Sequence, residues 1–289
     1  MFLGSGRAGA FGAALALFAA VPTLAVIIDS GDGAGNTNVP PQDPGWDHVG
    51  FREGATGIYL GGGWVLTAAH LGAASAIEFR GERYVSNPES KVQLRNEDGS
   101  ATDLILFQLE NASDLPDLPT LAIRTSTPPV GTDVIMIGYG RDRGPPTTCK
   151  GKDGWKWAAE NTKRWGTNQV DSPSMKISRD EALVTWSFAT TFDENLPTPH
   201  EAQAAHGDSG GAVFVESDSG YELAGVMWAV ESEECLAAIH ANLTYVADLS
   251  VYREQILGIT RSVFEEVERR GGKISRPSRG SRGACASSP

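Results

Sequence analysis

Short runs of hydrophobic residues, separated by glycine, proline, asparagine or acidic residues, follow one another along most of the chain. Aliphatic and β-branched residues dominate these runs, and no helical period appears in them. Short strands with regular turn residues between them indicate an antiparallel barrel or sandwich, and not alternating parallel strands and helices. The predicted strands cover residues 58–60, 64–68, 76–79, 92–94, 104–109, 134–137, 182–188, 212–215, 223–230 and 238–246.

Two segments interrupt this pattern. Residues 28–50 are crowded with glycine, proline, aspartate and asparagine, which predicts an extended, looping segment. Residues 141–169 are polar and carry Trp155, Trp157 and Trp165. We place a boundary between two halves of the fold shortly before this second stretch. We expect its tryptophans to pack a long surface loop, and binding of a ligand such as a glycan is the alternative.

A helical period appears only near the C-terminus. Val251, Ile256 and Ile259 recur at roughly helical spacing with charged residues between them, which predicts a closing amphipathic helix over 248–269. Residues 271–289 hold four basic residues and no acid among glycine, serine and proline. Such a tail has too little apolar surface to offset the entropy of ordering, so we predict that it is disordered.

The N-terminus has the features of an export signal. An apolar stretch follows Arg7 and ends in the small-residue sequence Thr23-Leu24-Ala25, which is typical of a signal peptide over 1–25 with cleavage after Ala25. An uncleaved membrane anchor is the alternative, because the apolar run continues to Ile28. Cleavage predicts a domain over 26–270 that is secreted or periplasmic and does not contact a membrane.

Charge and cysteine usage narrow the chemistry. Lys plus Arg is 24 and Asp plus Glu is 36, and the resulting net charge of −12 repels nucleic acid. Cys149, Cys235 and Cys285 allow at most one bridge within the chain. We expect Cys149 to pair with Cys235, because Cys285 lies in the tail. No CxxC motif or Cys/His cluster indicates a metal, and no cofactor is expected.

The segment 207–211 carries the most specific chemical signal in the chain. It reads Gly207-Asp208-Ser209-Gly210-Gly211. A serine hydroxyl needs a base to take its proton and amide donors to hold a developing oxyanion, and flanking glycines let backbone N–H groups approach one point. The pattern also fits the nucleophile turn of an α/β-hydrolase esterase. A strand-like sequence follows this serine, whereas the esterase turn opens a helix, so the esterase is the second choice.

Two further residues could serve this serine. His70 ends the apolar run Trp64-Val65-Leu66-Thr67-Ala68-Ala69, and an imidazole exchanges protons near neutral pH. Asp103 opens a strongly apolar strand, where a buried carboxylate requires a partner. Its functional role would be to accept a hydrogen bond from the imidazole and to fix its tautomer.

VLTAAH, DLILFQL and GDSGG together resemble the three signature segments of the trypsin/chymotrypsin family, in that family's order. The resemblance reaches from about Gly57 to the terminal helix. It implies an all-β fold of two six-stranded antiparallel barrels, over about 50–140 and 141–247, with the active site between them. It also implies a triad of His70, Asp103 and Ser209, with an oxyanion hole made by the amides of Gly207 and Ser209.

The sequence departs from the animal members of this family. Leu71 and Ala205 stand where those enzymes carry cysteines, which suggests a bacterial branch. Gln203 occupies the position at the base of the primary specificity pocket, which predicts a preference for uncharged side chains over Lys or Arg, unless Glu231 supplies a charge. By the same resemblance, Trp228 would form a pocket wall and His206 would line the pocket mouth.

The resemblance also implies an activation step. In the family, a new apolar N-terminus inserts and its ammonium pairs with the aspartate beside the nucleophile, which here is Asp208. Cleavage after Ala25 would expose Val26, Ile27 and Ile28. Asp29 and Ser30 stand where the family usually has glycine, so the path of this segment can differ.

The leading hypothesis is a monomeric, secreted serine endopeptidase acting on protein or peptide substrates through an acyl-enzyme. The alternatives are an esterase of another fold and a catalytically idle binding module. All three triad residues are present, and a binding role gives no reason to keep them.

Overall fold

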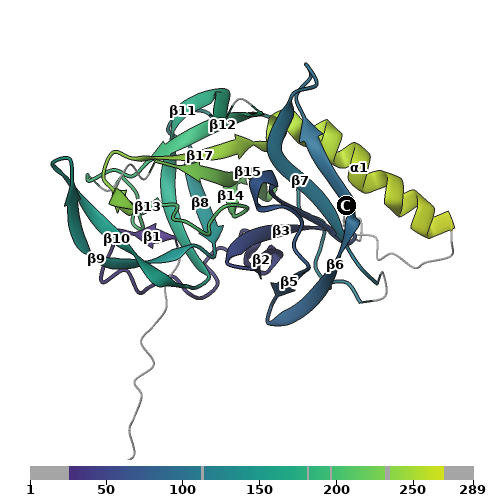
Figure 1. Ribbon diagram of the computed structural model, residues 1–289, viewed down its shortest axis with the longest axis horizontal. Coiled ribbons are helices and arrows are strands. Elements are labelled where there is room, and N and C mark those ends of the chain that lie inside the picture. Colours follow the sequence, from purple (N-terminus) through teal and green to yellow (C-terminus); the bar gives the residue numbers. More distant parts are fainter. Residues whose placement is uncertain (1–25, 112–113, 181, 196, 232–234, 270–289) are drawn as a thin grey trace, which may run out of the picture.

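Two closed six-stranded antiparallel barrels form the body of the protein, which confirms the predicted all-β fold (Figure 1). The computed structural model describes residues 26–111, 114–180, 182–195, 197–231 and 235–269. The predicted signal peptide, the predicted basic tail and Cys285 lie outside the described residues.

The first barrel closes in the order β2-β3-β4-β7-β6-β5. Its interior is filled by large side chains such as Tyr59, Ile77, Phe79 and Phe107, and alternation along each strand directs these residues to one face. The bounds are β2 (Val49–Arg52), β3 (Ala55–Gly61), β4 (Trp64–Ala68), β5 (Ala76–Phe79), β6 (Glu82–Arg95) and β7 (Ala101–Leu109).

The second barrel closes in the order β11-β12-β17-β15-β14-β8. The predicted boundary near residue 140 was wrong, because β8 pairs with β11 and β14 and so belongs to this barrel. The predicted strand 238–246 is two strands, separated by a turn at Ala241 with φ of 67°. The bounds are β8 (Asp133–Gly138), β11 (Arg164–Asp180), β12 (Leu183–Thr191), β14 (Ala212–Ser217), β15 (Gly220–Val230) and β17 (Leu243–Asp248).

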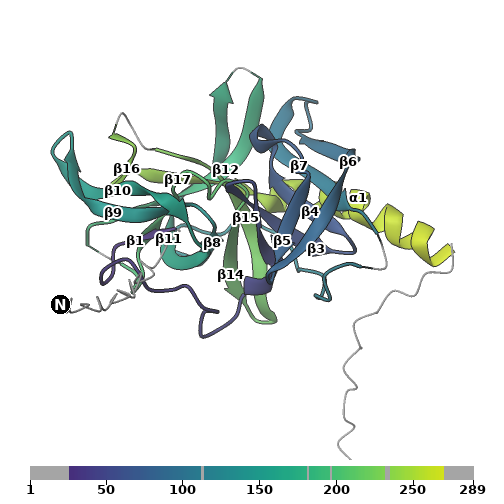
Figure 2. The ribbon, with the colours of Figure 1, turned by 60° about the horizontal axis from the view of Figure 1, so that its bottom comes forward.

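The polar stretch 141–169 is not a loop, which corrects the sequence-based expectation. It forms the hairpin of β9 (Arg141–Cys149) and β10 (Lys152–Asn161), which joins β16 (Ala237–Ile239) in a separate sheet. Polar residues occupy both faces of the hairpin, so no alternation was visible in the sequence. The guanidinium of Arg143 lies over the ring of Trp155, with its Cζ 3.3 Å from the centre of that ring. Figure 2 shows this sheet and the first barrel at opposite ends of the molecule.

The remaining elements tie these units together. Cys149 and Cys235 are bridged, with a Cα–Cα distance of 6.2 Å, so the expected pairing is confirmed. The short strand β1 (Ile27–Ile28) pairs with β13 (Ala202–Gln203). Shortly after β13 comes the turn 207–211 that carries Ser209, which we call the serine turn. Two 3-10 turns cover Trp46–His48 and Ala69–Leu71. The helix α1 (Leu249–Arg269) matches the predicted closing helix and buries Tyr252 and Ile256 in the core.

Candidate active site

His70 and Asp103 are in direct contact. His70 lies in the 3-10 turn that follows β4, and Asp103 lies in the neighbouring strand β7, where Leu104 pairs with Ala68. The carboxylate is fully buried; its Oδ2 lies 2.7 Å from Nδ1 of His70, and its Oδ1 accepts the backbone N–H of the same residue at 2.7 Å. The two contacts fix both the position and the plane of the imidazole, which leaves Nε2 to act as a base.

The turn that carries Ser209 is docked on the first barrel. The carbonyl of Ser209 accepts the N–H of Thr56 at 3.1 Å, and the hydroxyl of Thr56 donates to the carbonyl of Gly207 at 3.0 Å. Gly210 has a φ of +87°, and a Cβ there would overlap the carbonyl of Thr56 and the hydroxyl of Thr67. This close approach requires glycine, and it holds the serine turn against β3 and β4, the strands that lead to His70.

In the described residues, the hydroxyl and two backbone amides of the serine turn form no hydrogen bonds. Ser209 is half-buried, and within the described residues its Oγ makes no hydrogen bond, to His70 or to any other group. The backbone N–H groups of Gly207 and Ser209 likewise donate to no acceptor in the described part of the chain. Gly207 has a φ of +101°, a conformation that L side chains rarely adopt. Two amide donors therefore stand free on either side of Asp208.

Asp208 is buried in the same turn. Its carboxylate accepts the N–H groups of Gly140, at 2.6 Å, and Ala205, at 2.8 Å. The pKa of Asp208 is raised from 3.8 to about 7. Burial is the largest cause and the charge of Asp142 adds to it, whereas the two hydrogen bonds and the charge of Arg164 lower the pKa. The carboxylate thus lacks a cation strong enough to offset its loss of solvation.

The predicted N-terminal segment lies beside this turn. Val26 is fully buried and packs in one cluster with Ala202 and Ala204. Ile27 pairs with Gln203 in the β1–β13 ladder. The segment that cleavage after Ala25 would expose is therefore seated on the strand that leads to Asp208.

The residues predicted for the specificity pocket have different environments. Gln203 is fully buried, and its Nε2 donates to the carbonyl of Glu231 at 3.1 Å. Trp228 is 1% exposed, and its Nε1 donates to Ser187 at 2.9 Å. His206 is exposed, with its ring 6.5 Å from that of Trp157.

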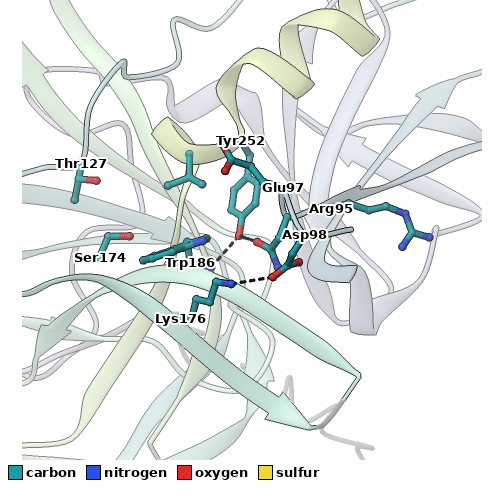
Figure 3. Close-up of a pocket in the computed structure, with 10 residues that line it drawn as sticks. Arg95, Glu97, Asp98, Thr127, Ser174, Lys176, Trp186 and Tyr252 are labelled. Carbon is teal, nitrogen blue, oxygen red and sulfur yellow. Dashed lines mark hydrogen bonds and ion pairs between the residues drawn. The ribbon is translucent and has the colours of Figure 1, made fainter. Parts of the chain in front are cut away.

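The residues that support Asp103 have no recognisable pattern in the sequence, and sequence reasoning missed them. The backbone N–H of Asp103, in the first barrel, donates to the hydroxyl of Thr185, in the second barrel, at 2.8 Å. Asn96 donates to the neighbouring carbonyl of Val184, and the hydroxyl of Tyr252 bridges Asn96 and the N–H of Trp186. Figure 3 shows Tyr252 and Trp186 beside a cavity of about 500 Å³, in which Lys176 and Asp98 form an ion pair of 3.0 Å.

The described residues contain neither a cluster of metal ligands nor a membrane-spanning helix. No group of three or more His, Cys, Asp or Glu residues among them could hold a metal ion. Within the same ranges, no helix has the length and apolar character that a membrane crossing needs.

The two closed six-stranded barrels with one C-terminal helix define the trypsin-like fold. The trypsin family model matches residues 34–249, and the chain belongs to that family. A sequence search of curated proteins finds no match.

Two solved structures illustrate the fold. Neuropsin, a serine protease expressed in the limbic system of mouse brain, is 18% identical with a TM-score of 0.53, over 77% of this chain and 96% of that chain. A mutant of human heparin binding protein is 16% identical with a TM-score of 0.51, over 78% of this chain and 96% of that chain.

Proposed function

We propose that this protein is a serine endopeptidase that cleaves peptide bonds through an acyl-enzyme. Membership of the trypsin family supports peptidase activity. In the proposed mechanism Ser209 attacks the peptide carbonyl, Nε2 of His70 takes the serine proton and later donates it to the leaving amine, and Asp103 stabilises the imidazolium. The free N–H groups of Gly207 and Ser209 bind the developing oxyanion. Water then hydrolyses the acyl-enzyme by the reverse proton path.

The contact between Asp103 and His70 carries this proposal. A buried carboxylate that holds the backbone and the ring of one histidine fixes the tautomer that a general base requires. A binding module gives no reason for this arrangement. The esterase alternative requires a parallel sheet, whereas the two barrels of this protein are antiparallel. Export after cleavage at Ala25 is part of the proposal, because trypsin-like proteases are commonly secreted. A monomeric state is also part of the proposal.

Labelling with a fluorophosphonate probe tests the proposal directly. We expect the probe to modify Ser209 and no other serine, because this is the hydroxyl that the proposed mechanism pairs with the base His70 and with the free amides of Gly207 and Ser209. Mass spectrometry of the digested protein identifies the modified residue. Labelling should disappear in His70→Ala. A protein that stays unlabelled, or that is labelled at another serine, would contradict the assignment.

A second expected result concerns pH. Only a neutral imidazole can accept the serine proton, so the rate of hydrolysis should fall as His70 becomes protonated at low pH. The measurement is the pH profile of kcat/KM on one peptide substrate. The acid limb should be absent from whatever activity remains in His70→Ala, and its persistence there would assign the limb to another group.

A further inference from the structure

We propose that the cavity between the β11–β12 hairpin and the start of α1 binds a neutral saccharide (Figure 3). Its volume of about 500 Å³ lies within the range of about 300 to 1,000 Å³ that is usual for small-ligand sites. The hairpin, the first turn of α1 and residues 95–98 at the end of β6 supply most of its lining. His70, Asp103 and Ser209 do not line this cavity, so the inference stands apart from the proposed function.

One wall of the cavity is a face of the β11–β12 hairpin. Lys176 pairs with Trp186 in the register of the two strands, and Ser174 lies two residues before Lys176. Because side chains alternate along a strand, Ser174 and Lys176 share the face on which Trp186 lies. The half-buried ring of Trp186 gives this wall a flat apolar surface, and Val251 of α1, which is 46% exposed, adds an aliphatic contact. The C–H groups of a pyranose ring can pack on such a surface.

The hydroxyl of Ser174 is left without a partner at this wall. The register of β11 against β12 shifts between Ser172 and Met175, and a bulge of this kind changes the direction of the side chains within it. The Oγ of Ser174 is buried and makes no hydrogen bond in the described chain. A buried hydroxyl without a partner is unfavourable, and a hydroxyl group of a ligand, which both donates and accepts, would remove that cost.

The charges that line the cavity cancel. Arg95 and Lys176 are positive, whereas Glu97 and Asp98 are negative, and Lys176 forms an ion pair of 3.0 Å with Asp98. An ionic ligand would therefore be repelled by one pair of side chains as much as it is attracted by the other. Ammonium and guanidinium groups supply donors, and carboxylates supply acceptors. This mixture favours a neutral ligand with many hydroxyl groups, since each hydroxyl can serve both kinds of partner.

Hydrogen bonds between distant segments hold the walls of the cavity in place. The hydroxyl of Tyr252, in α1, donates to Oδ1 of Asn96 at 3.0 Å and accepts the backbone N–H of Trp186 at 2.8 Å. Asn96 donates to the carbonyl of Val184 and to the hydroxyl of Ser100, each at 2.8 Å. The three parts of the lining are thus tied together before a ligand arrives, which lowers the entropic cost of binding.

Titration with two neutral disaccharides, cellobiose and N,N′-diacetylchitobiose, tests the inference without catalysis. The indole N–H signals of the ¹⁵N-labelled full chain are followed by NMR, and Trp186→Phe identifies the signal of Trp186 among the seven tryptophans by its loss. We expect at least one of the two sugars to shift the Trp186 signal in a saturable manner and to leave the signals of Trp155, Trp157 and Trp165 in place, since these three do not line the cavity with Trp186.

Substitutions in the hairpin check the site. Trp186→Ala should abolish binding, but Trp186 also packs against the core, so a smaller change decides the assignment. Ser174→Ala should weaken binding of the sugar by about fivefold, the effect of one hydrogen bond between neutral groups. Ser172→Ala, in the same strand but outside the lining, is the matched control and should bind the sugar as the unchanged protein does.

A charged sugar tests the neutral character of the site. N-acetylglucosamine 6-sulfate differs from N-acetylglucosamine by one anionic group, and it should bind no more tightly than the neutral sugar. Clearly tighter binding of the sulfated sugar would overturn the assignment to a neutral ligand. The inference also fails if neither disaccharide shifts the Trp186 signal up to its solubility limit, if only other tryptophan signals respond, or if Ser174→Ala binds as tightly as the Ser172→Ala control.

Discussion

Replacing Ser209 by alanine should lower the rate of peptide hydrolysis by about 10⁴-fold or more. The triad acts as a unit, so loss of the nucleophile removes the acyl-enzyme path, and only the contribution of binding and of the amide donors remains. Kinetics on one peptide substrate, at equal concentrations of the folded variant and the unchanged protein, measures this change.

The fold should tolerate this substitution. The hydroxyl of Ser209 makes no hydrogen bond in the described chain, and the turn is held by backbone contacts to Thr56 that alanine preserves. The melting temperature of Ser209→Ala should therefore stay near that of the unchanged protein. Ser172→Ala, in β11, is the matched control and should keep full activity. Substantial activity in Ser209→Ala would remove Ser209 from the mechanism.

Protein that begins at Val26 should be far more active than protein with one additional N-terminal residue. In the proposed activation, the new α-ammonium pairs with Asp208, whose buried carboxylate has no sufficient cation of its own. The pair would hold the turn that carries the amides of Gly207 and Ser209, and without it this turn would relax. The loss of one oxyanion donor alone lowers kcat by about 10²- to 10³-fold, which sets the expected difference.

The pH dependence of stability should also separate the two forms. We call the protein with the additional N-terminal residue the extended form. In this form the pKa of Asp208 is raised from 3.8 to about 7. The unfolded carboxylate ionises first as pH rises, so the extended form loses stability between about pH 4 and pH 7. In the protein that begins at Val26, the N-terminal ammonium offsets this loss of stability. Its stabilisation is complete below the free α-amino pKa of about 7.7 to 8.0 and is lost as pH rises through the higher folded value.

Two measurements check this activation. Kinetics and melting temperatures of both forms are compared from pH 4 to pH 9, with Asp208→Asn as the control that should remove the pH dependence of the extended form. Sequencing of the natural mature end tests the cleavage site. Equal activity of the two forms, or a mature end well beyond Ile28, would show that Asp208 is stabilised in another way.

Local patterns in the sequence predicted the parts of the fold that local interactions determine. The strands β4 and β5 have their predicted bounds, because each is a short run of mostly apolar residues that the fold buries, and β4 is buried along its whole length. The closing helix followed from its helical period. The hairpin β9–β10 was missed, because both of its faces are polar and its edge strand contains Pro145 and Pro146.

The sequence by itself determined which residues are available for the proposed chemistry: His70, Asp103 and the glycine-rich turn of Ser209 are recognisable from their own neighbours. The tertiary structure decided that His70 and Asp103 meet and which residues hold them and the turn of Ser209. Thr56 contacts Gly207 across 151 residues, and Thr185 supports Asp103 across 82. Glu231 reaches Gln203 in the same way, across 28 residues. These contacts exist only once both barrels have closed, because hydrogen bonds between distant segments leave no period or motif in the sequence around either partner.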